Sequence, residues 1–75
     1  MKRKKEDVLL HDQIWFKIRY YQKVHKLPND ILAAYLGVTE RTLQEYDKHA
    51  ENVTLGKIEK FLKSENLELN ELLGL

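Results

Sequence analysis

Apolar residues recur at intervals of three and four along most of the chain, and this spacing predicts a series of amphipathic helices. The first apolar stripe consists of Leu10, Ile14, Ile18 and Tyr21, broadened by Trp15 and Val24. It predicts a helix that begins at about Asp7 or Asp12 and ends near His25. The Leu27-Pro28 step terminates this helix, because the residue before a proline avoids helical geometry. The charged residues expected on its water-facing side are Lys17, Arg19 and Lys23.

A second and a third helix are predicted on either side of a tight turn at residues 37–39. The second begins at Asn29 or Pro28, and Gly37 suits the left-handed position just after its end. Thr39 is a good N-cap for the third helix, which runs to about Lys48. The residues expected to face inward are Ile31, Leu32, Ala33, Leu36, Leu43 and Tyr46.

Two more helices are predicted after a polar stretch at residues 49–53, which has no periodicity and is expected to be a loop. Thr54 is expected to cap the fourth helix, and Asn66 to end it in a left-handed conformation. Asn70 is a candidate cap for a short last helix. The inner face of the fourth helix is expected to be Leu55, Ile58, Phe61 and Leu62. The pattern as a whole predicts an all-α fold with five helices.

Length and composition agree with one small helical domain, which we place at residues 7–75. The chain has 75 residues with one Pro and three Gly, and it has no Cys to form a disulfide or a thiolate metal site. The residues before this domain, 1–6, are expected to be a flexible basic arm that carries Lys2, Arg3, Lys4 and Lys5. Apolar runs stay well short of the roughly 20 residues of a membrane span, so we expect a soluble, cytoplasmic protein.

Charge is distributed unevenly around a formal net value of +1. Residues 1–26 have eight basic and three acidic side chains, a balance of 8 − 3 = +5. Residues 27–47 have one basic and four acidic side chains, or 1 − 4 = −3, and residues 48–75 have four and five, or −1. The basic surplus therefore lies at the amino end, while the segment around the third helix is acidic.

An ordered series of residues between Ile18 and Leu73 resembles the lambda-repressor-like family, the Cro and xenobiotic-response-element type of helix-turn-helix regulator. The residues that carry the resemblance are Asn29, Leu32-Ala33, Gly37-Val38-Thr39, Leu43 and Asp47, continued by Thr54-Leu55, Ile58, Phe61, Leu67, Leu69 and Leu72-Leu73. The resemblance implies a compact five-helix DNA-binding domain, a regulator of transcription from a prokaryote, phage or mobile element. Its third helix would enter the DNA major groove.

The sequence departs from the family pattern at several positions. Asn29 stands where the family usually has Gln, and His49 and Glu65 replace a common Gly and a core Leu. Gln22 occupies the position where the family often has an Arg that pairs with the acidic residue, here Asp47. The resemblance therefore implies a hydrogen bond from Gln22 to Asp47 in place of an ion pair.

By resemblance, the outer face of the third helix reads DNA bases. Arg41 suits guanine and Gln44 suits adenine, whereas the two glutamates can only accept a hydrogen bond, as from cytosine. The residues expected to contact bases are Glu40, Arg41, Gln44 and Glu45. The residues expected to contact the DNA backbone are Asn29, Thr39, Thr42 and Lys48, together with Lys2, Arg3, Lys4 and Lys5 of the basic arm.

Other functions were compared with DNA binding. A protein-interaction module, such as an antirepressor or assembly adaptor, would use the acidic face of the third helix against a basic partner without binding DNA. The apolar carboxyl end predicts a homodimer through Leu69, Leu72, Leu73 and Leu75. The three histidines, His11, His25 and His49, lack metal-ligand spacing, and we expect neither a metal nor a cofactor. The sole serine, Ser64, has no histidine within a helical turn, so an enzyme is not expected.

Overall fold

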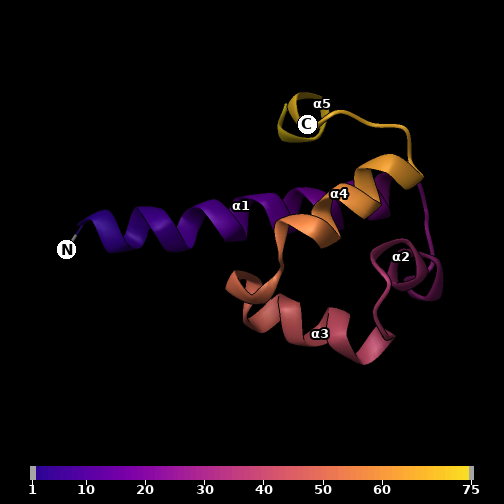
Figure 1. Ribbon diagram of the computed structural model, residues 1–75, viewed down its shortest axis with the longest axis horizontal. Helices are drawn as coiled ribbons and strands as arrows, with labels where there is room; N and C mark the ends of the chain where they lie inside the picture. Colours follow the sequence, from indigo (N-terminus) through magenta and orange to yellow (C-terminus); the bar gives the residue numbers. More distant parts are fainter. Residues whose placement is uncertain (1, 75) are drawn as a thin grey trace.

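The computed structural model describes the backbone of residues 2–74 and the side chains of residues 10–74. Within these residues the chain forms five α-helices and a single turn of 3-10 helix (Figure 1), which confirms the predicted all-α, five-helix fold. In chain order they are α1 (Lys2–Val24), α2 (Asn29–Leu36), α3 (Glu40–Lys48), η1 (Ala50–Asn52), α4 (Leu55–Ser64) and α5 (Leu69–Leu73). None of these described helices is both long and apolar enough to cross a membrane.

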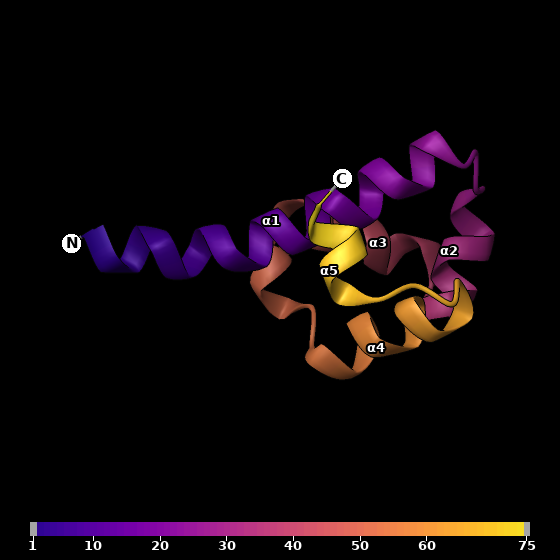
Figure 2. The same cartoon turned by 90° about the horizontal axis from the view of Figure 1, so that it is seen from above.

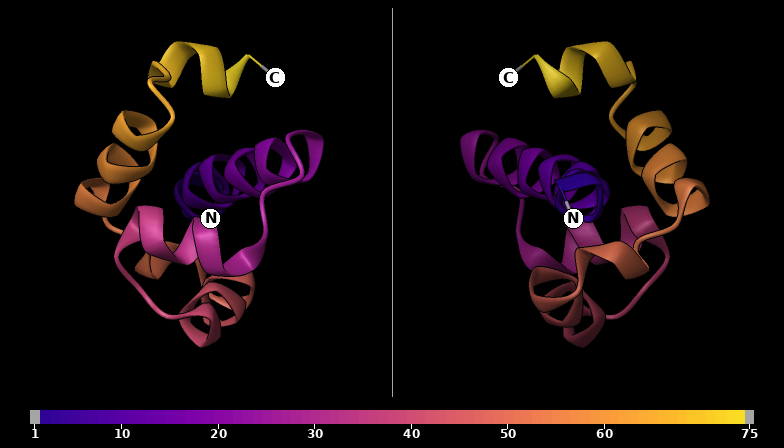
Figure 3. Two further views of the ribbon diagram at one scale, coloured as in Figure 1. Left: turned by 90° about the vertical axis from the view of Figure 1, so that its right-hand side faces the viewer. Right: turned by 90° about the vertical axis from the view of Figure 1, so that its left-hand side faces the viewer.

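The long helix α1 is the element around which the others are arranged. Its carboxyl half is surrounded by the shorter helices, and its amino end projects beyond them (Figures 1 and 2). Viewed along its axis, α2, α3, α4 and α5 surround α1 on three sides and leave one side open (Figure 3). The largest fully buried side chains are Trp15, Ile18, Leu32, Leu36, Leu43, Phe61 and Leu72. Burial of each contributes about 1.5–3 kcal/mol, so this cluster is the main source of stability.

Local capping sets most helix boundaries where the sequence predicts them. Gly37 is left-handed at φ 75°, and its N–H and that of Val38 bond back to α2, which ends the helix. Thr39 and Thr54 accept hydrogen bonds from the backbone N–H groups of Thr42 and Lys57, as N-caps do. Asn66 is left-handed at φ 53°. The predicted cap at Asn70 is wrong, because Glu68 and Glu71 form a reciprocal capping box at the start of α5.

Some residues predicted to face the core are exposed. Leu10 lies in the amino-terminal half of α1, and 57% of it is exposed. Val24 lies two residues after the buried Gln22, about 160° from it around the helix, and is 55% exposed. Leu55, the first residue of α4, is 76% exposed, and Ile31 is just above a third exposed. Both lie at the first turn of a short helix, where the core covers one side only.

Two segments differ from the extended or irregular structure expected of them. The stretch at residues 49–53 contains η1, and its Ala50 and Val53 are buried in the core. The stretch was expected to be a loop because most of its residues are polar and its two apolar residues, Ala50 and Val53, are too few to show a helical period. Over the basic arm, residues 1–6, the described backbone is helical from Lys2 onward.

Candidate nucleic-acid interface

The turn at residues 37–39 separates α2 from α3 and holds them at an angle rather than as one continuous rod (Figure 1). Behind α3, Leu43 is fully buried and Tyr46 nearly so. Tyr46 meets the ring of Trp15 edge to face, with centroids 5.2 Å apart. These contacts fix one side of α3 to the core and leave the opposite side at the surface.

All four residues predicted to contact bases are exposed. At 100° per residue, Arg41, Gln44 and Glu45 lie on the side of α3 opposite Leu43 and Tyr46. Lys48 shares this outward strip. The strip carries two cations and one carboxylate, and Glu40 lies at its edge in the first turn. Thr42 is half-buried, and its hydroxyl lies 3.0 Å from that of Thr39, so both hydroxyls serve the cap at the start of α3.

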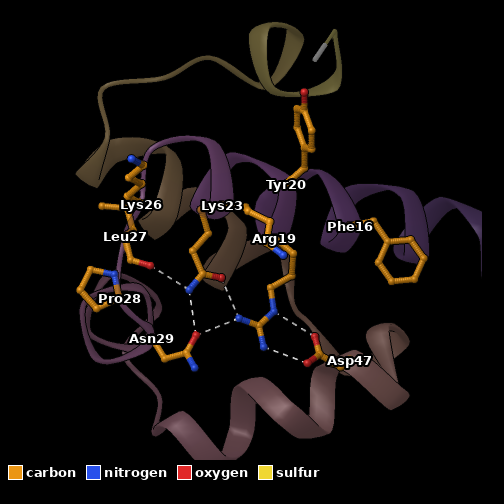
Figure 4. A pocket seen from close by; sticks show the side chains of 10 residues that line it. Phe16, Arg19, Tyr20, Lys23, Lys26, Leu27, Pro28, Asn29 and Asp47 are labelled. Carbon is orange, nitrogen blue, oxygen red and sulfur yellow. Dashed lines mark hydrogen bonds and ion pairs between the residues drawn. The ribbon is translucent and has the colours of Figure 1, made fainter.

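Asp47, the acidic residue near the end of α3, is bound from two positions on α1. Arg19 grips its carboxylate bidentately, with Nε 3.0 Å from Oδ1 and Nη2 2.8 Å from Oδ2 (Figure 4). The indole N–H of Trp15 also donates to Oδ1 at 2.8 Å. The guanidinium carbon of Arg19 lies 5.6 Å from the centre of the Trp15 ring. The expectation that Arg19 faces water is therefore wrong, because it reaches sideways across α1 to α3.

Gln22 does not contact Asp47 as the resemblance implies. Its Nε2 donates to the carbonyl of Leu27 at 3.0 Å and to Oδ1 of Asn29 at 2.8 Å. Its Oε1 accepts from Nη1 of Arg19 at 2.7 Å, and the same Nη1 donates to Oδ1 of Asn29 at 3.1 Å. The Asn29 oxygen is thus occupied by two donors, so only its amide NH₂ could meet a phosphate. Arg19, one turn earlier on α1, makes the ion pair with Asp47 instead.

The ion pair changes the charge that α3 presents. The hydrogen bond from Arg19 lowers the pKa of Asp47, against an opposing effect of partial burial, and the Trp15 N–H lowers it further. Asp47 is therefore ionised, but its charge is compensated by Arg19. Of the four acidic side chains in residues 27–47, one is neutralised within the fold, and Arg41, Gln44, Glu45 and Lys48 dominate the outer strip.

Glu65, which replaces an expected core leucine, accepts a hydrogen bond from the hydroxyl of Tyr21 at 2.7 Å. This bond, with burial and the nearby carboxylate charge, raises the pKa of Tyr21 to about 12. Glu65 also raises the pKa of Tyr35. The Tyr21 ring stacks on His25 and meets Phe61 edge to face, so the carboxylate is accommodated at the edge of the aromatic cluster. Glu65 thus fixes the end of α4 to α1.

The remaining predicted contacts are only partly described. Lys48 is exposed at the end of α3. The side chains of Lys2, Arg3, Lys4 and Lys5 lie outside the described residues, as does Leu75. At the predicted dimer surface, Leu72 is fully buried in the core of its own chain, so its assignment to an interface is wrong. Leu69 and Leu73 are about 40% exposed. Within residues 10–74 no cluster of three or more metal-ligating side chains occurs.

A groove of about 810 Å³ beside α1 was missed by the sequence reasoning (Figure 4). It runs from Phe16 and Tyr20 on α1 to Leu27 and Pro28 in the α1–α2 connection. Lys23 also lines it. Phe16 and Tyr20 are each more than half exposed. Their four-residue spacing on a helix predicted to be amphipathic was the available signal.

Comparison of the chain with models of known protein families, with curated proteins and with solved structures finds no match.

Proposed function

We propose that this protein is a small sequence-specific DNA-binding regulator of transcription, whose α3 lies in the major groove. The observation that carries the proposal is the placement of α3: one side is anchored by Leu43 and Tyr46, and the other exposes Arg41, Gln44 and Lys48. A helix presented after a tight turn on a compact scaffold is the element that helix-turn-helix proteins insert into DNA. The pairing of Asp47 with Arg19 removes one negative charge that would oppose a phosphate backbone.

The proposal assigns a role to each side chain of the outer strip. Arg41 would donate two hydrogen bonds to O6 and N7 of a guanine, and Gln44 would pair with N6 and N7 of an adenine. Glu45 would accept from a cytosine amino group, and Glu40 would do so at the edge of the contact. Lys48 and the NH₂ of Asn29 would hold phosphates, with the basic arm on the flanking backbone.

Two copies would bind a palindromic site, with α3 of each copy about 34 Å from the other along the duplex. Leu69 and Leu73, which remain partly exposed on α5, would contribute the apolar contact between the copies. The protein would act on the genome of a prokaryote, phage or mobile element, in the cytoplasm and without catalytic activity of its own. Sedimentation equilibrium with and without a selected duplex would measure the stoichiometry.

The test is selection of binding sites from a random duplex pool, followed by affinity measurements on the enriched site. Arg41→Ala should weaken binding by about 1–3 kcal/mol, or about 5- to 150-fold, and relax the preference at one base position. Lys63→Ala removes an exposed cation on α4 and is the matched control, which should leave the preference unchanged. Each phosphate contact should add about −0.9 to the slope of the logarithm of the binding constant against the logarithm of the salt concentration.

The outcome that would contradict the proposal is the absence of any enriched sequence. A duplex titration in which amide NMR shifts fall outside α3 and the amino end would contradict it equally. Tight capture of a basic protein by the same face, with no duplex binding at moderate salt, would instead support an antirepressor or assembly adaptor.

A further inference from the structure

The open side of α1 carries a row of apolar side chains that none of the other described helices covers. Phe16, Tyr20 and Val24 follow one another at intervals of four residues, and each is between 53% and 57% exposed. Figure 3 shows that α2, α4 and α5 leave a gap on one side of α1, and the exposure of these three side chains agrees with such a gap. We call Phe16, Tyr20 and Val24 the α1 ridge.

Phe16 and Tyr20 of the α1 ridge line the groove of about 810 Å³, whereas Val24 is exposed but does not line it. From Phe16 to Val24 the ridge spans about 12 Å at 1.5 Å per residue, and the groove continues past it to Leu27 and Pro28. A surface of this length matches two to three turns of a partner helix that packs parallel to it. Partner helices commonly bind such surfaces by inserting side chains spaced three or four residues apart. The groove is open along its length, so an occupant would bury one side only (Figure 4).

The charge around this surface is positive. Lys23 and Lys26 line the groove together with Arg19, and the lining contains a single carboxylate, that of Asp47. Because Arg19 already pairs with Asp47, the two lysines are the charges that a visiting molecule would meet. An occupant with apolar side chains flanked by carboxylates would therefore match the surface in both shape and charge.

We propose that the α1 ridge and its groove bind an acidic amphipathic helix of another protein. A second copy of this chain is a poor occupant, because its own α1 would bring the same lysines against Lys23 and Lys26. A nucleic acid strand would gain from stacking on Phe16 and Tyr20, but Val24, Leu27 and Pro28 offer no aromatic platform. The α1 ridge is separate from the outward strip of α3, although Asn29 and Asp47 at one end of the groove lie close to that helix or belong to it.

The probe is a synthetic acidic peptide of about 14 residues, or about four helical turns, with leucines on one face and glutamates on the other. Its binding is measured by fluorescence anisotropy of the labelled peptide and by amide NMR shifts of the whole protein. We expect a dissociation constant between 1 μM and 1 mM, on the order expected for a short helix, and shifts centred on residues 16–28. Phe16→Ala should weaken binding by about fivefold or more, since truncation of a buried aromatic anchor typically costs over 1 kcal/mol.

Matched substitutions on α4 distinguish binding at the α1 ridge from non-specific binding of the peptide to exposed apolar or charged residues. Leu55→Ala removes an apolar side chain that is still more exposed, on α4, and should leave binding unchanged. Lys23→Glu should weaken binding about tenfold and reduce its salt dependence, whereas Lys63→Glu makes the same charge change on α4 and should do neither. A peptide with lysine in place of every glutamate should not bind. The four substituted positions, Phe16, Lys23, Leu55 and Lys63, are all exposed, so the fold should survive each substitution.

Several outcomes would overturn the proposal. Absence of peptide binding at about 1 mM, or an equal effect of Leu55→Ala and Phe16→Ala, would do so. Tighter binding of a single-stranded oligonucleotide to the α1 ridge would assign the surface to nucleic acid instead. Self-association that Phe16→Ala abolishes in sedimentation would assign it to a second copy. Duplex binding through α3 should be unaffected by Phe16→Ala, so failure of this proposal leaves the proposed DNA-binding function untouched.

Discussion

Asp47→Ala should be among the most destabilising substitutions outside the apolar core, and its cost follows from the two groups that it leaves without an acceptor. The Trp15 indole is fully buried, and loss of the Asp47 carboxylate that accepts from it leaves the N–H unpaired among the described residues, at a cost of about 1–3 kcal/mol. The pair with Arg19 is bidentate but partly exposed, with 43% of the Asp47 side chain accessible, so it contributes about 1 kcal/mol rather than the larger value of a buried pair. We therefore expect a loss of about 3 kcal/mol.

Asp47→Asn is the matched variant, because it retains an oxygen that can accept from Trp15 but removes the charge that holds Arg19. It should cost only about 1 kcal/mol. A domain of 75 residues has a total stability of about 4–11 kcal/mol, so the difference between the two variants is readily measured. The alanine variant should melt about 12–24 °C lower and the asparagine variant about 4–8 °C lower than the parent.

Urea unfolding followed by the fluorescence of Trp15, the single tryptophan, reports directly on this site. Because the folded-state pKa of Asp47 is lowered, its stabilising effect is present above the unfolded pKa of about 3.9 and is lost as pH falls below it. The parent should therefore lose stability below about pH 4 more steeply than Asp47→Asn. Equal stability of Asp47→Ala and Asp47→Asn would refute the reasoning. So would a loss of stability below about pH 4 that is no steeper in the parent than in Asp47→Asn.

Two further predictions concern the cap of α2 and the tyrosine–carboxylate contact. Gly37→Ala should destabilise the protein by about 1 kcal/mol, since its φ of 75° is costly with a Cβ and the nearest atom, Lys60 Nζ, can move aside. Gly56→Ala is the control on α4, where a Cβ has room, and urea unfolding should show no loss; a loss equal to that of Gly37→Ala would exclude the backbone explanation. The raised pKa of Tyr21 favours its neutral form when folded, so stability present below about pH 10 should decline as pH rises toward 12. Tyr21→Phe should cost about 1 kcal/mol at neutral pH and flatten that alkaline decline in thermal unfolding; an unchanged alkaline limb would contradict the assignment.

The helix boundaries could be predicted from the sequence because they depend on local chemistry. A left-handed position favours glycine or asparagine, as at Gly37 and Asn66, whichever helices pack nearby, but Lys26 after α1 is also left-handed at φ 54° and gives no such signal. The hydroxyls of Thr39 and Thr54 cap the helices that follow them for the same local reason. The position of α3 on the surface also followed, since Leu43 and Tyr46 mark its inner side within a single helix.

Burial along α1 could not be read from periodicity alone. The apolar residues of α1 lie on both of its sides, so spacing cannot distinguish the Trp15 side, which the core covers, from the α1 ridge, which it leaves open. Which side is covered depends on where α2 to α5 pack, and this is set by contacts far apart in the sequence. Leu10 was predicted to be buried for the same reason, and the groove beside Phe16 depends on the path of the α1–α2 connection.

The resemblance implied that Asp47 contacts Gln22, whereas the structure shows Asp47 bound by Arg19 and Trp15 on the same helix. Trp15, Arg19 and Gln22 lie within about 60° of one another around α1, so all three face the same neighbours. Adjacent turns are 5.4 Å apart, and an extended arginine side chain can cross that distance, whereas a glutamine cannot. Gln22 is close enough to α2 to bond Asn29 and Leu27, and Arg19 reaches past it to α3. The requirement that fixes α3 is therefore an extended cation on this side of α1, which Arg19 meets and Gln22 does not.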